Sequence, residues 1–396
     1  MSRYKFVPFF LSIIMLVVSI MAVGKTDVQT KPVNTATYDE TSEDLKGIWV
    51  SYITLDMQNS GKSKKDFENK IKDIIKTTKE SGFNTLIFQV RPFCDALYES
   101  SIYPWSHILT GTQGEKPGYD PLEIMCDMCH ENNINIHAWI NPYRVSSAKT
   151  PNELCDENPY IKDPTIGFEH NGNIYLDPSN EKAVKLIVNG VTEIVRKYDV
   201  DGIQFDDYFY PQDSDTIDDE IYNIYAENSD NPLSKEEWRA ENVSSMIQMV
   251  YQAVHKVSKN IIFGISPQGN INNNMALGAD VKAWCEKEGY IDYICPQIYF
   301  SLDNPALTFE ECIDEWLSIK LHKNLIFYVG LAGYKGGTDE DEGTWLDNND
   351  ILKNEIEIST EKGADGIMLY SYECFLNDEN QAEIQNVANY LTGVTQ

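Results

Sequence analysis

The chain has 396 residues, which is long enough for two average domains or for one large α/β barrel. It carries 62 acidic against 32 basic residues, a formal net charge of −30 at pH 7. Such an acidic chain repels phosphate backbones and anionic lipid, which argues against nucleic-acid binding and places no restriction on a neutral polymer.

The first 24 residues form a segment of their own. Arg3 and Lys5 precede an apolar run at residues 6–23, which ends among small residues. This order is typical of a secretory signal, and the run is nearly long enough to cross a bilayer as an uncleaved anchor. We therefore expect residues 1–24 to be a signal peptide or an N-terminal membrane anchor, with possible membrane tethering through residues 6–23. The rest of the chain is then exported, either extracellular or in the cell envelope.

Residues 25–46 are polar and without apolar period, which predicts a flexible linker. From there on, short apolar strands alternate with amphipathic helices eight times. The predicted strands are 47–53, 85–91, 135–144, 201–208, 261–268, 292–300, 325–331 and 366–372. The predicted helices lie near 64–81, 120–132, 179–198, 234–258, 279–288, 308–321, 349–362 and 379–391.

Eight strand–helix units predict that residues 47–396 form a single (β/α)8 TIM barrel, of the α/β class. The alternative is a doubly wound open sheet. That fold usually carries a glycine-rich phosphate loop after its first strand, and none follows Ile53. We therefore prefer the barrel, in which active sites gather at the C-terminal ends of the strands.

The eight cysteines do not indicate a disulfide framework, because most fall in predicted helices or strands, where a buried free thiol is common. Cys126 and Cys129 form a C-x-x-C motif, but no second Cys or His pair accompanies it to complete a zinc site. The chain also lacks H-x-x-x-H, Walker and G-x-G-x-x-G motifs. We therefore expect no metal and no cofactor.

The fourth predicted strand runs directly into two adjacent carboxylates, Asp206 and Asp207. Period-two alternation turns Ile203 and Phe205 toward the helices, and it turns Gln204 and Asp206 toward the barrel interior. On the other strands, the residues with the same inward orientation are polar or aromatic near the C-terminal ends. A barrel interior that serves only packing would instead have Val, Ile and Leu at these positions. The inward set is Gln89, Arg91, His137, Trp139, Asn141, Gln204, Tyr208, Ser266, Gln268, Gln297, Tyr299, Tyr370 and Tyr372.

A cleft of carboxylates and rings suits glycoside hydrolysis, which uses two carboxyl groups about 5 Å apart for retention and farther apart for inversion. Asp206 is the first candidate. Its partner stays open among Asp207, Asp95 in the loop after the second strand, and Glu373 after the eighth strand. The long loop after the second strand also carries Tyr98, Tyr103 and Trp105. These rings either line sugar subsites or form a core of the loop itself.

Seven stretches carry a resemblance to a known family, and they follow one another along nearly the whole predicted barrel. They are Gln89-Val90-Arg91-Pro92, Asp95-Ala96-Leu97-Tyr98, Pro104-Trp105-Ser106, Leu109-Thr110-Gly111, His137-Ala138-Trp139-Ile140-Asn141-Pro142-Tyr143-Arg144, the run 201–211 and Pro296-Gln297-Ile298-Tyr299. Together they resemble the glycosyl-hydrolase-like 10 family. The positions that match it are Arg91, Asp95, Asn141, Asp206, Asp207 and Tyr299, and Tyr143 and Arg144 of the fifth stretch are further candidates for substrate binding.

The resemblance implies a TIM barrel, an exported or envelope-attached protein, and glycoside hydrolysis. It implies peptidoglycan glycan strands without stem peptides as the partner, with the matching residues in catalysis or substrate binding. Two alternatives stay open. One is a catalytically silent glycan-binding protein of the envelope, and the other is a hydrolase of a different extracellular polysaccharide.

Overall fold

The computed structural model describes residues 44–148 and 150–394. Eight parallel strands close into a barrel in the order β1-β11-β10-β9-β8-β7-β3-β2, which confirms the predicted TIM barrel. The strands are β1 (Leu45–Val50), β2 (Thr85–Arg91), β3 (Asn135–Ile140), β7 (Gly202–Phe205), β8 (Ile262–Ile265), β9 (Tyr293–Ile294), β10 (Ile326–Ala332) and β11 (Gly366–Tyr370).

The barrel begins slightly earlier than the sequence predicts. β1 starts at Leu45, inside the predicted linker 25–46, and pairs with both β11 and β2. The predicted signal or anchor at residues 1–24 lies outside the described residues. Within the part of the chain that the structure describes, no helix combines the length and apolar character needed to cross a membrane.

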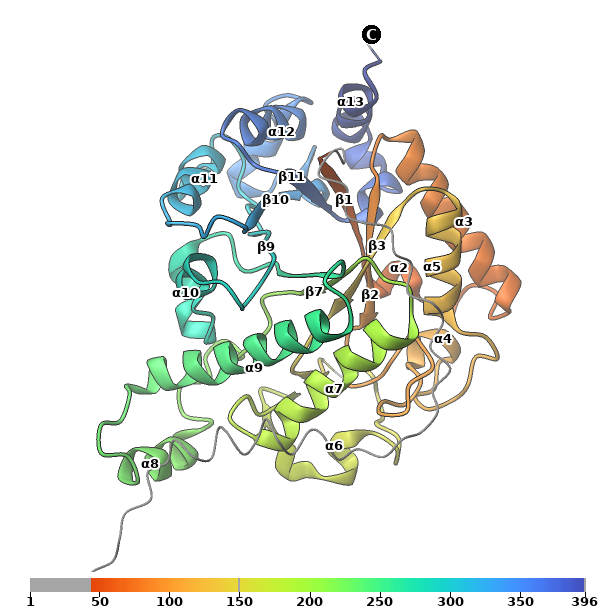
Figure 1. Ribbon diagram of the computed structural model, residues 1–396. Coiled ribbons are helices and arrows are strands. Elements are labelled where there is room, and N and C mark those ends of the chain that lie inside the picture. The colour runs from red at the N-terminus through yellow and green to blue at the C-terminus, as the bar shows by residue number, and fades with distance from the viewer. Residues whose placement is uncertain (1–43, 149, 395–396) are drawn as a thin grey trace, which may run out of the picture. The chain divides into compact units, whose positions relative to one another are not determined.

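All eight predicted helices are present, and they lie around the outside of the strands (Figure 1). Two of them begin with well-defined caps. Ser63 and Asp66 form a reciprocal capping box, and Asp120 caps a helix whose first residue is Pro121. The helices are α3 (Lys64–Glu80), α5 (Pro121–Glu131), α7 (Glu181–Lys197), α9 (Lys235–Val257), α10 (Val281–Glu286), α11 (Phe309–Leu317), α12 (Ile351–Glu361) and α13 (Gln381–Thr392).

The strand residues divide between two apolar clusters, as the alternation predicts. Leu86, Phe88 and Val90 of β2 belong to the large cluster between the strands and the helices. A smaller cluster fills the barrel interior with the opposite parity, and full burial of one such side chain contributes about 1.5–3 kcal/mol. Its buried members are Leu45, Trp49, Ile87, Trp139, Tyr293, Cys295, Tyr328 and Met368.

Arg91, at the end of β2, breaks this parity. The register between β2 and β3 shifts after Gln89, so that Arg91 pairs with Ile140. The guanidinium lies 4.8 Å from the centre of the Tyr103 ring, and the Tyr103 hydroxyl in turn donates to the carbonyl of Leu186 in α7. Arg91 is therefore on the helix side of the sheet. The predicted inward position of Arg91 is wrong, because the β-bulge turns the end of β2 so that the Arg91 side chain points toward the helices.

A second sheet, which the sequence did not predict, follows β3. The predicted strand 135–144 ends at Ile140, because Pro142 has no N–H to donate to a ladder. The chain then forms an antiparallel sheet in the order β4-β6-β5. Its strands are β4 (Arg144–Ser146), β5 (Gly167–His170) and β6 (Asn173–Leu176). The other α-helices in the described part of the chain are α2 (Tyr52–Leu55), α4 (His107–Thr110), α6 (Pro159–Lys162) and α8 (Asp219–Glu227).

All eight cysteines are free thiols. Seven are buried, and Cys155 is half-buried. The sequence interpretation that these are packing residues rather than a disulfide framework agrees with this arrangement.

Candidate active site

Asp206 directly follows β7 at the C-terminal mouth of the barrel, and its side chain is only 4% exposed. Its Oδ2 accepts the indole N–H of Trp139 at 3.0 Å and also the side-chain amide of Asn141. Its Oδ1 accepts only a longer bond, 3.3 Å, from the backbone N–H of Tyr208. With Oδ2 taken by two donors, Oδ1 is the oxygen that is placed to hold a proton.

Asp207 is half-buried and faces different partners. Its Oδ1 accepts the side-chain amide of Gln297 at 3.1 Å, and its Oδ2 accepts that of Gln268 at 3.2 Å. These glutamines follow β9 and β8, whereas Asp206 is bound from the β3 side. The adjacent carboxylates are thus held separately, and both lie at the end of one strand.

The two carboxylates hold protons more tightly than isolated ones. Burial raises the pKa of Asp206 to about 7, and the charge of Asp207 adds to that effect, while Arg144 and the Trp139 bond oppose it. Burial also raises the pKa of Asp207, against the hydrogen bonds from Gln297 and Gln268. Two interacting carboxyls of this kind share a proton near neutral pH, which provides one acid and one anion.

A buried chain of amides sets the orientation of Asn141. The backbone N–H of Tyr52 donates to Oε1 of Gln89 at 3.0 Å, and Nε2 of Gln89 donates to Oδ1 of Asn141 at 2.6 Å. Because Oδ1 of Asn141 is the acceptor, its Nδ2 is directed at Asp206. Gln89 and Asn141 therefore position the carboxylate from below.

Tyrosine and tryptophan rings cover the mouth opposite β7. Tyr370, at the end of β11, lies with its ring centre 5.8 Å from that of Tyr299, in a stacked arrangement, and 6.1 Å from that of Trp49. Trp139 and Tyr334 also contact Tyr370 edge-on. Tyr334 is 40% exposed, so this wall offers a ring to solvent and to a sugar.

Two of these rings, Trp49 and Tyr334, are absent from the predicted set. Trp49 has the inward parity of β1, so alternation applied to the first strand would have found it. Tyr334 lies in a short 3-10 turn, Gly333–Lys335, just after β10, where strand parity no longer applies.

Arg144 brings positive charge to the pair. Its guanidinium lies 4.9 Å from the centre of the Phe93 ring and 5.2 Å from that of Tyr208, and its Nε donates to the carbonyl of Pro92 at 2.7 Å. Tyr208 is 51% exposed, so its outer face is free for a ligand. The sequence selected Arg144 and Tyr208, and the structure brings both to the mouth.

Glu373 also lies near the mouth, but its carboxylate is bound within the protein. Its Oε1 accepts the hydroxyls of Ser51, at 2.6 Å, and Thr54, and its Oε2 accepts the hydroxyl of Ser371. Because Ser51 follows β1 and Ser371 follows β11, this carboxylate links the two strand ends where the barrel closes. We assign it an anchoring position rather than a place opposite Asp206.

Asp95, another predicted partner, lies in the core of the loop after β2. It is fully buried, and its Oδ2 is bound by the amide of Gln113 at 2.9 Å and lies 3.3 Å from Nδ1 of His107. None of its hydrogen bonds reaches Asp206 or Asp207. The structure therefore does not support Asp95 as the second carboxyl.

The predicted rings Tyr98 and Tyr143 are 1% and 0% exposed, and neither hydroxyl has a hydrogen-bond partner among the described residues. A ring without an accessible face cannot stack on a sugar, so the prediction that they bind substrate is corrected to core packing. Tyr98 packs edge-on against Tyr198, and Tyr143 against Phe209. Trp105 remains half-buried in the same loop as Tyr98.

His137 and Gln204 lie in the barrel interior below the mouth. Nδ1 of His137 lies 3.2 Å from the Tyr293 hydroxyl, and burial lowers the pKa of His137 to about 4. Oε1 of Gln204 accepts the Trp49 indole N–H at 2.9 Å. Both are buried and bonded within the protein, so they support the site from beneath and do not reach a ligand.

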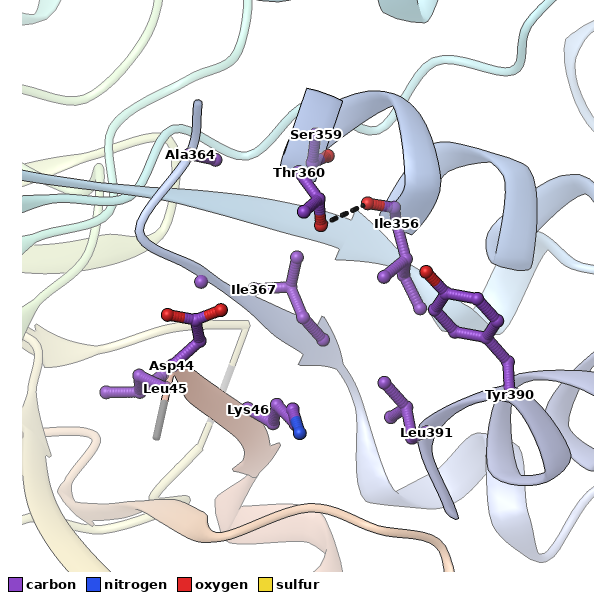
Figure 2. A pocket seen from close by; sticks show the side chains of 11 residues that line it. Asp44, Leu45, Lys46, Ile356, Ser359, Thr360, Ala364, Ile367, Tyr390 and Leu391 are labelled. Carbon is purple, nitrogen blue, oxygen red and sulfur yellow. Dashed lines mark hydrogen bonds between the residues drawn. The ribbon is translucent and has the colours of Figure 1, made fainter. Parts of the chain in front are cut away.

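A separate cavity of about 370 Å³ lies at the other end of the strands (Figure 2). It contains none of the predicted site residues. It is lined by Asp44, Leu45, Lys46, Ile356, Ser359, Thr360, Ala364, Gly366, Ile367, Tyr390 and Leu391. Its lining includes the first residues of β1 and β11, far along the strands from the residues that follow their C-terminal ends, and we assign it no catalytic part.

Within residues 44–148 and 150–394, no group of three or more His, Cys, Asp and Glu side chains is arranged to hold a metal ion.

Closed barrels with acidic side chains at their C-terminal mouth are a common scaffold of glycoside hydrolases, and this chain has that architecture. The chain belongs to the glycosyl hydrolase-like 10 family, whose sequence model matches residues 44–347. This confirms the resemblance found in the sequence motifs.

Two curated relatives share 31% of their aligned residues with this chain. The alignment with glycosyl hydrolase YngK of Bacillus subtilis (strain 168) is 336 positions long and covers 79% of this chain and 65% of that protein. The alignment with glycosyl hydrolase DigH of Escherichia coli (strain K12) is 362 positions long and covers 82% of each protein. The chain thus spans slightly less than two thirds of the length of the Bacillus relative.

Solved structures with the same fold are far more distant in sequence. The glycoside hydrolase domain of PgaB (BpsB) from Bordetella bronchiseptica has a TM-score of 0.60 at 11% identity, over 88% of this chain and 99% of that one. The catalytic domain of β-amylase from Paenibacillus polymyxa has a TM-score of 0.56 at 11% identity, over 90% of this chain and 100% of that one. At such identities the likeness establishes the fold alone.

Proposed function

We propose that this glycoside hydrolase acts on cell-envelope glycan, and specifically on peptidoglycan glycan strands that lack stem peptides. The observation that carries the proposal is the Asp206–Asp207 pair. The two carboxyls are held by separate donors beside a wall of rings, and Asp207 is only half-buried. Charge for an oxocarbenium-like centre and flat faces for pyranose rings are what glycan cleavage requires.

Each carboxyl has a role that follows from its contacts. Asp206 carries the proton on Oδ1 and delivers it to the glycosidic oxygen, because Oδ2 is already bound by Trp139 and Asn141. Asp207 stays ionised, since amide N–H groups meet both of its oxygens, and it stabilises the positive charge that develops at the sugar. Tyr208 and Tyr334 offer exposed rings on either side.

The charge of the chain supports the choice of a stripped glycan. The net charge of −30 repels the carboxylates of the stem peptides on intact peptidoglycan. A glycan without stem peptides carries fewer negative charges and is repelled less. The proposal includes export, which is supported by the basic residues and the apolar run at 6–23. Fractionation of cells that produce the full chain, compared with a chain lacking residues 1–24, tests it, and equal cytoplasmic recovery of both would contradict export.

The activity is tested with the purified full chain on peptidoglycan from which an amidase has removed the stem peptides. We expect release of soluble oligosaccharides, slower release from intact peptidoglycan, and a loss of about 100-fold or more in D206N. The matched control is D213N. Asp213 lies in the same loop with an exposed side chain and a φ of 53°, which asparagine also adopts readily, so this variant loses the same charge without changing the site.

Other outcomes decide between the alternatives. Binding of the stripped glycan in calorimetry with no product after long incubation would favour the glycan-binding protein. Release from a different polysaccharide, and none from peptidoglycan, would keep the hydrolase and reject the proposed substrate.

A further inference from the structure

The positions of Asp206 and Asp207 restrict which group can attack the anomeric carbon of a bound sugar. This inference rests on the proposed function. Asp206 and Asp207 are consecutive residues, about 3.8 Å apart at Cα, at the end of a single strand. They therefore approach a bound sugar from the same wall of the barrel. Displacement at the anomeric carbon needs one group at the leaving oxygen and a nucleophile, or a base with water, on the opposite side of that carbon.

Within the part of the chain that the structure describes, the two other carboxylates considered for that second role are bound inside the protein. Glu373 is bound by three hydroxyl groups. Asp95 is fully buried in the core of its loop. Tyr370 lies close enough for the charge of Asp206 to act on its hydroxyl, and the rings of Tyr299 and Trp49 pack against Tyr370.

The tyrosine hydroxyls of this wall are also poor nucleophiles. Burial, together with the charges of Glu373 and Asp206, raises the pKa of Tyr370 to about 12. Burial likewise raises the pKa of Tyr299 well above its usual value. Neither hydroxyl is ionised at neutral pH, so the protein wall opposite the carboxyl pair is apolar and unreactive.

We propose that the nucleophile is the 2-acetamido group of the substrate, so that the enzyme is specific for N-acetylhexosamine in the cleavage subsite. The half-buried rings of Tyr299 and Tyr370, which Trp49 supports from the barrel interior, hold the pyranose and the acetamido methyl. Asp207, fixed by Gln268 and Gln297, accepts the acetamido N–H and turns the carbonyl oxygen toward the anomeric carbon.

The steps balance without any further reactant. The acetamido oxygen forms a bond to the anomeric carbon as the glycosidic C–O bond breaks, and the proton on Oδ1 of Asp206 moves to the leaving oxygen. The result is a cyclic oxazolinium, whose N–H charge Asp207 neutralises. Asp206, now ionised, takes a proton from water while that water adds to the anomeric carbon and opens the ring. The product keeps the configuration of the substrate.

The first test uses two substrates and one inhibitor with the full chain. The substrates are peptide-stripped glycan and the same glycan after chemical N-deacetylation, and the inhibitor is N-acetylglucosamine thiazoline, a stable analogue of the cyclic intermediate. We expect at least about 100-fold slower cleavage after deacetylation, and inhibition by the thiazoline at least about 100-fold tighter than by N-acetylglucosamine. NMR of the first product should show retained configuration.

The second test separates the two carboxylates with a 2,4-dinitrophenyl glycoside of an N-acetylglucosamine oligomer, whose leaving group needs no proton. D206N should form the cyclic intermediate from this substrate at nearly the wild-type rate, whereas D207N should lose about 100-fold. D213N is again the control.

The outcomes distinguish this inference from the proposed function. Equal cleavage of acetylated and deacetylated glycan, or an inverted product, would overturn participation of the acetamide while leaving a glycan hydrolase. Full activity of D207N on the aryl glycoside would overturn the assignment of Asp207. If the wild-type chain cleaves no glycan at all, the proposed function itself fails.

Discussion

Trp139 of β3 donates its indole N–H to Oδ2 of Asp206 across 3.0 Å, and this bond connects the neighbouring strands β3 and β7 at the centre of the site. The same oxygen also accepts from Asn141, which Gln89 holds in place. Both bonds favour the ionised carboxylate, and burial favours the protonated one. The protonation of Asp206 near neutral pH is thus a balance between burial and a few donors.

Replacement of Trp139 by Phe should shift that balance. The variant loses one donor to the carboxylate, so the pKa of Asp206 rises. Because Asp206 acts in its protonated form, the basic limb of the kcat/KM profile should move to higher pH, by about one unit or less. W316F is the control, since Trp316 donates its indole N–H to the carbonyl of Gly269 in a buried position. An unmoved basic limb in W139F would show that the limb does not report on Asp206.

Asp206 should also make the folded protein less stable as the pH rises. Its pKa is about 7 in the folded chain and about 3.9 when unfolded, so the folded state binds more protons between those values. The free energy of unfolding therefore falls as the pH rises from about 4 to about 7. D206N removes this penalty. It should exceed the wild type by an amount on the order of 2 kcal/mol at pH 8, and the difference should vanish near pH 4.

Urea unfolding of both proteins at the two pH values measures this difference. An equal difference at pH 4 and pH 8 would contradict a raised pKa at Asp206. A less stable D206N at pH 8 would show that the ionised carboxylate is favoured by its donors more than burial disfavours it.

Strand alternation predicted the barrel interior well where the strands are regular. Trp139, Gln204 and Asp206 all have the orientation that parity assigns. The reason is that eight parallel strands buried on both sides allow only one orientation for each residue, so the apolar pattern determines the register. The alternating helices, with their caps, determined the fold class in the same way.

The predictions failed where the chain leaves regular pairing. The bulge at Arg91 depends on how β2 and β3 meet, which no local pattern in β2 records. Tyr98 looks the same in sequence whether its loop folds over a core or over a cleft, and here the ring is buried. Glu373 required the positions of Ser51 and Ser371, which come together only when the first and last strands close the barrel.

The anchoring position of Glu373 predicts a specific difference between two variants. E373Q keeps an acceptor for Ser51 and Thr54, and its new amide can donate to the Ser371 hydroxyl, so it should keep its stability and at least about a tenth of the activity. E373A leaves three hydroxyls without their acceptor and should lose about 1–3 kcal/mol of unfolding free energy. Loss of activity in a fully stable E373Q would instead place Glu373 in the chemistry.

Substitutions of the exposed Tyr208 and of the buried Tyr98 should have different effects on KM and on stability. Y208A removes a ring that is 51% exposed beside Arg144, so KM for the stripped glycan should rise, by up to about 10-fold for a lost contact of about 1 kcal/mol, with kcat nearly unchanged. Y98F removes a buried hydroxyl that has no hydrogen-bond partner within the described chain. It should leave both kinetic constants unchanged and keep or increase stability, because an unsatisfied buried hydroxyl is unfavourable. Steady-state kinetics together with urea unfolding distinguish the two variants. A raised KM in Y98F would show that Tyr98 contributes to substrate binding, as the sequence allowed.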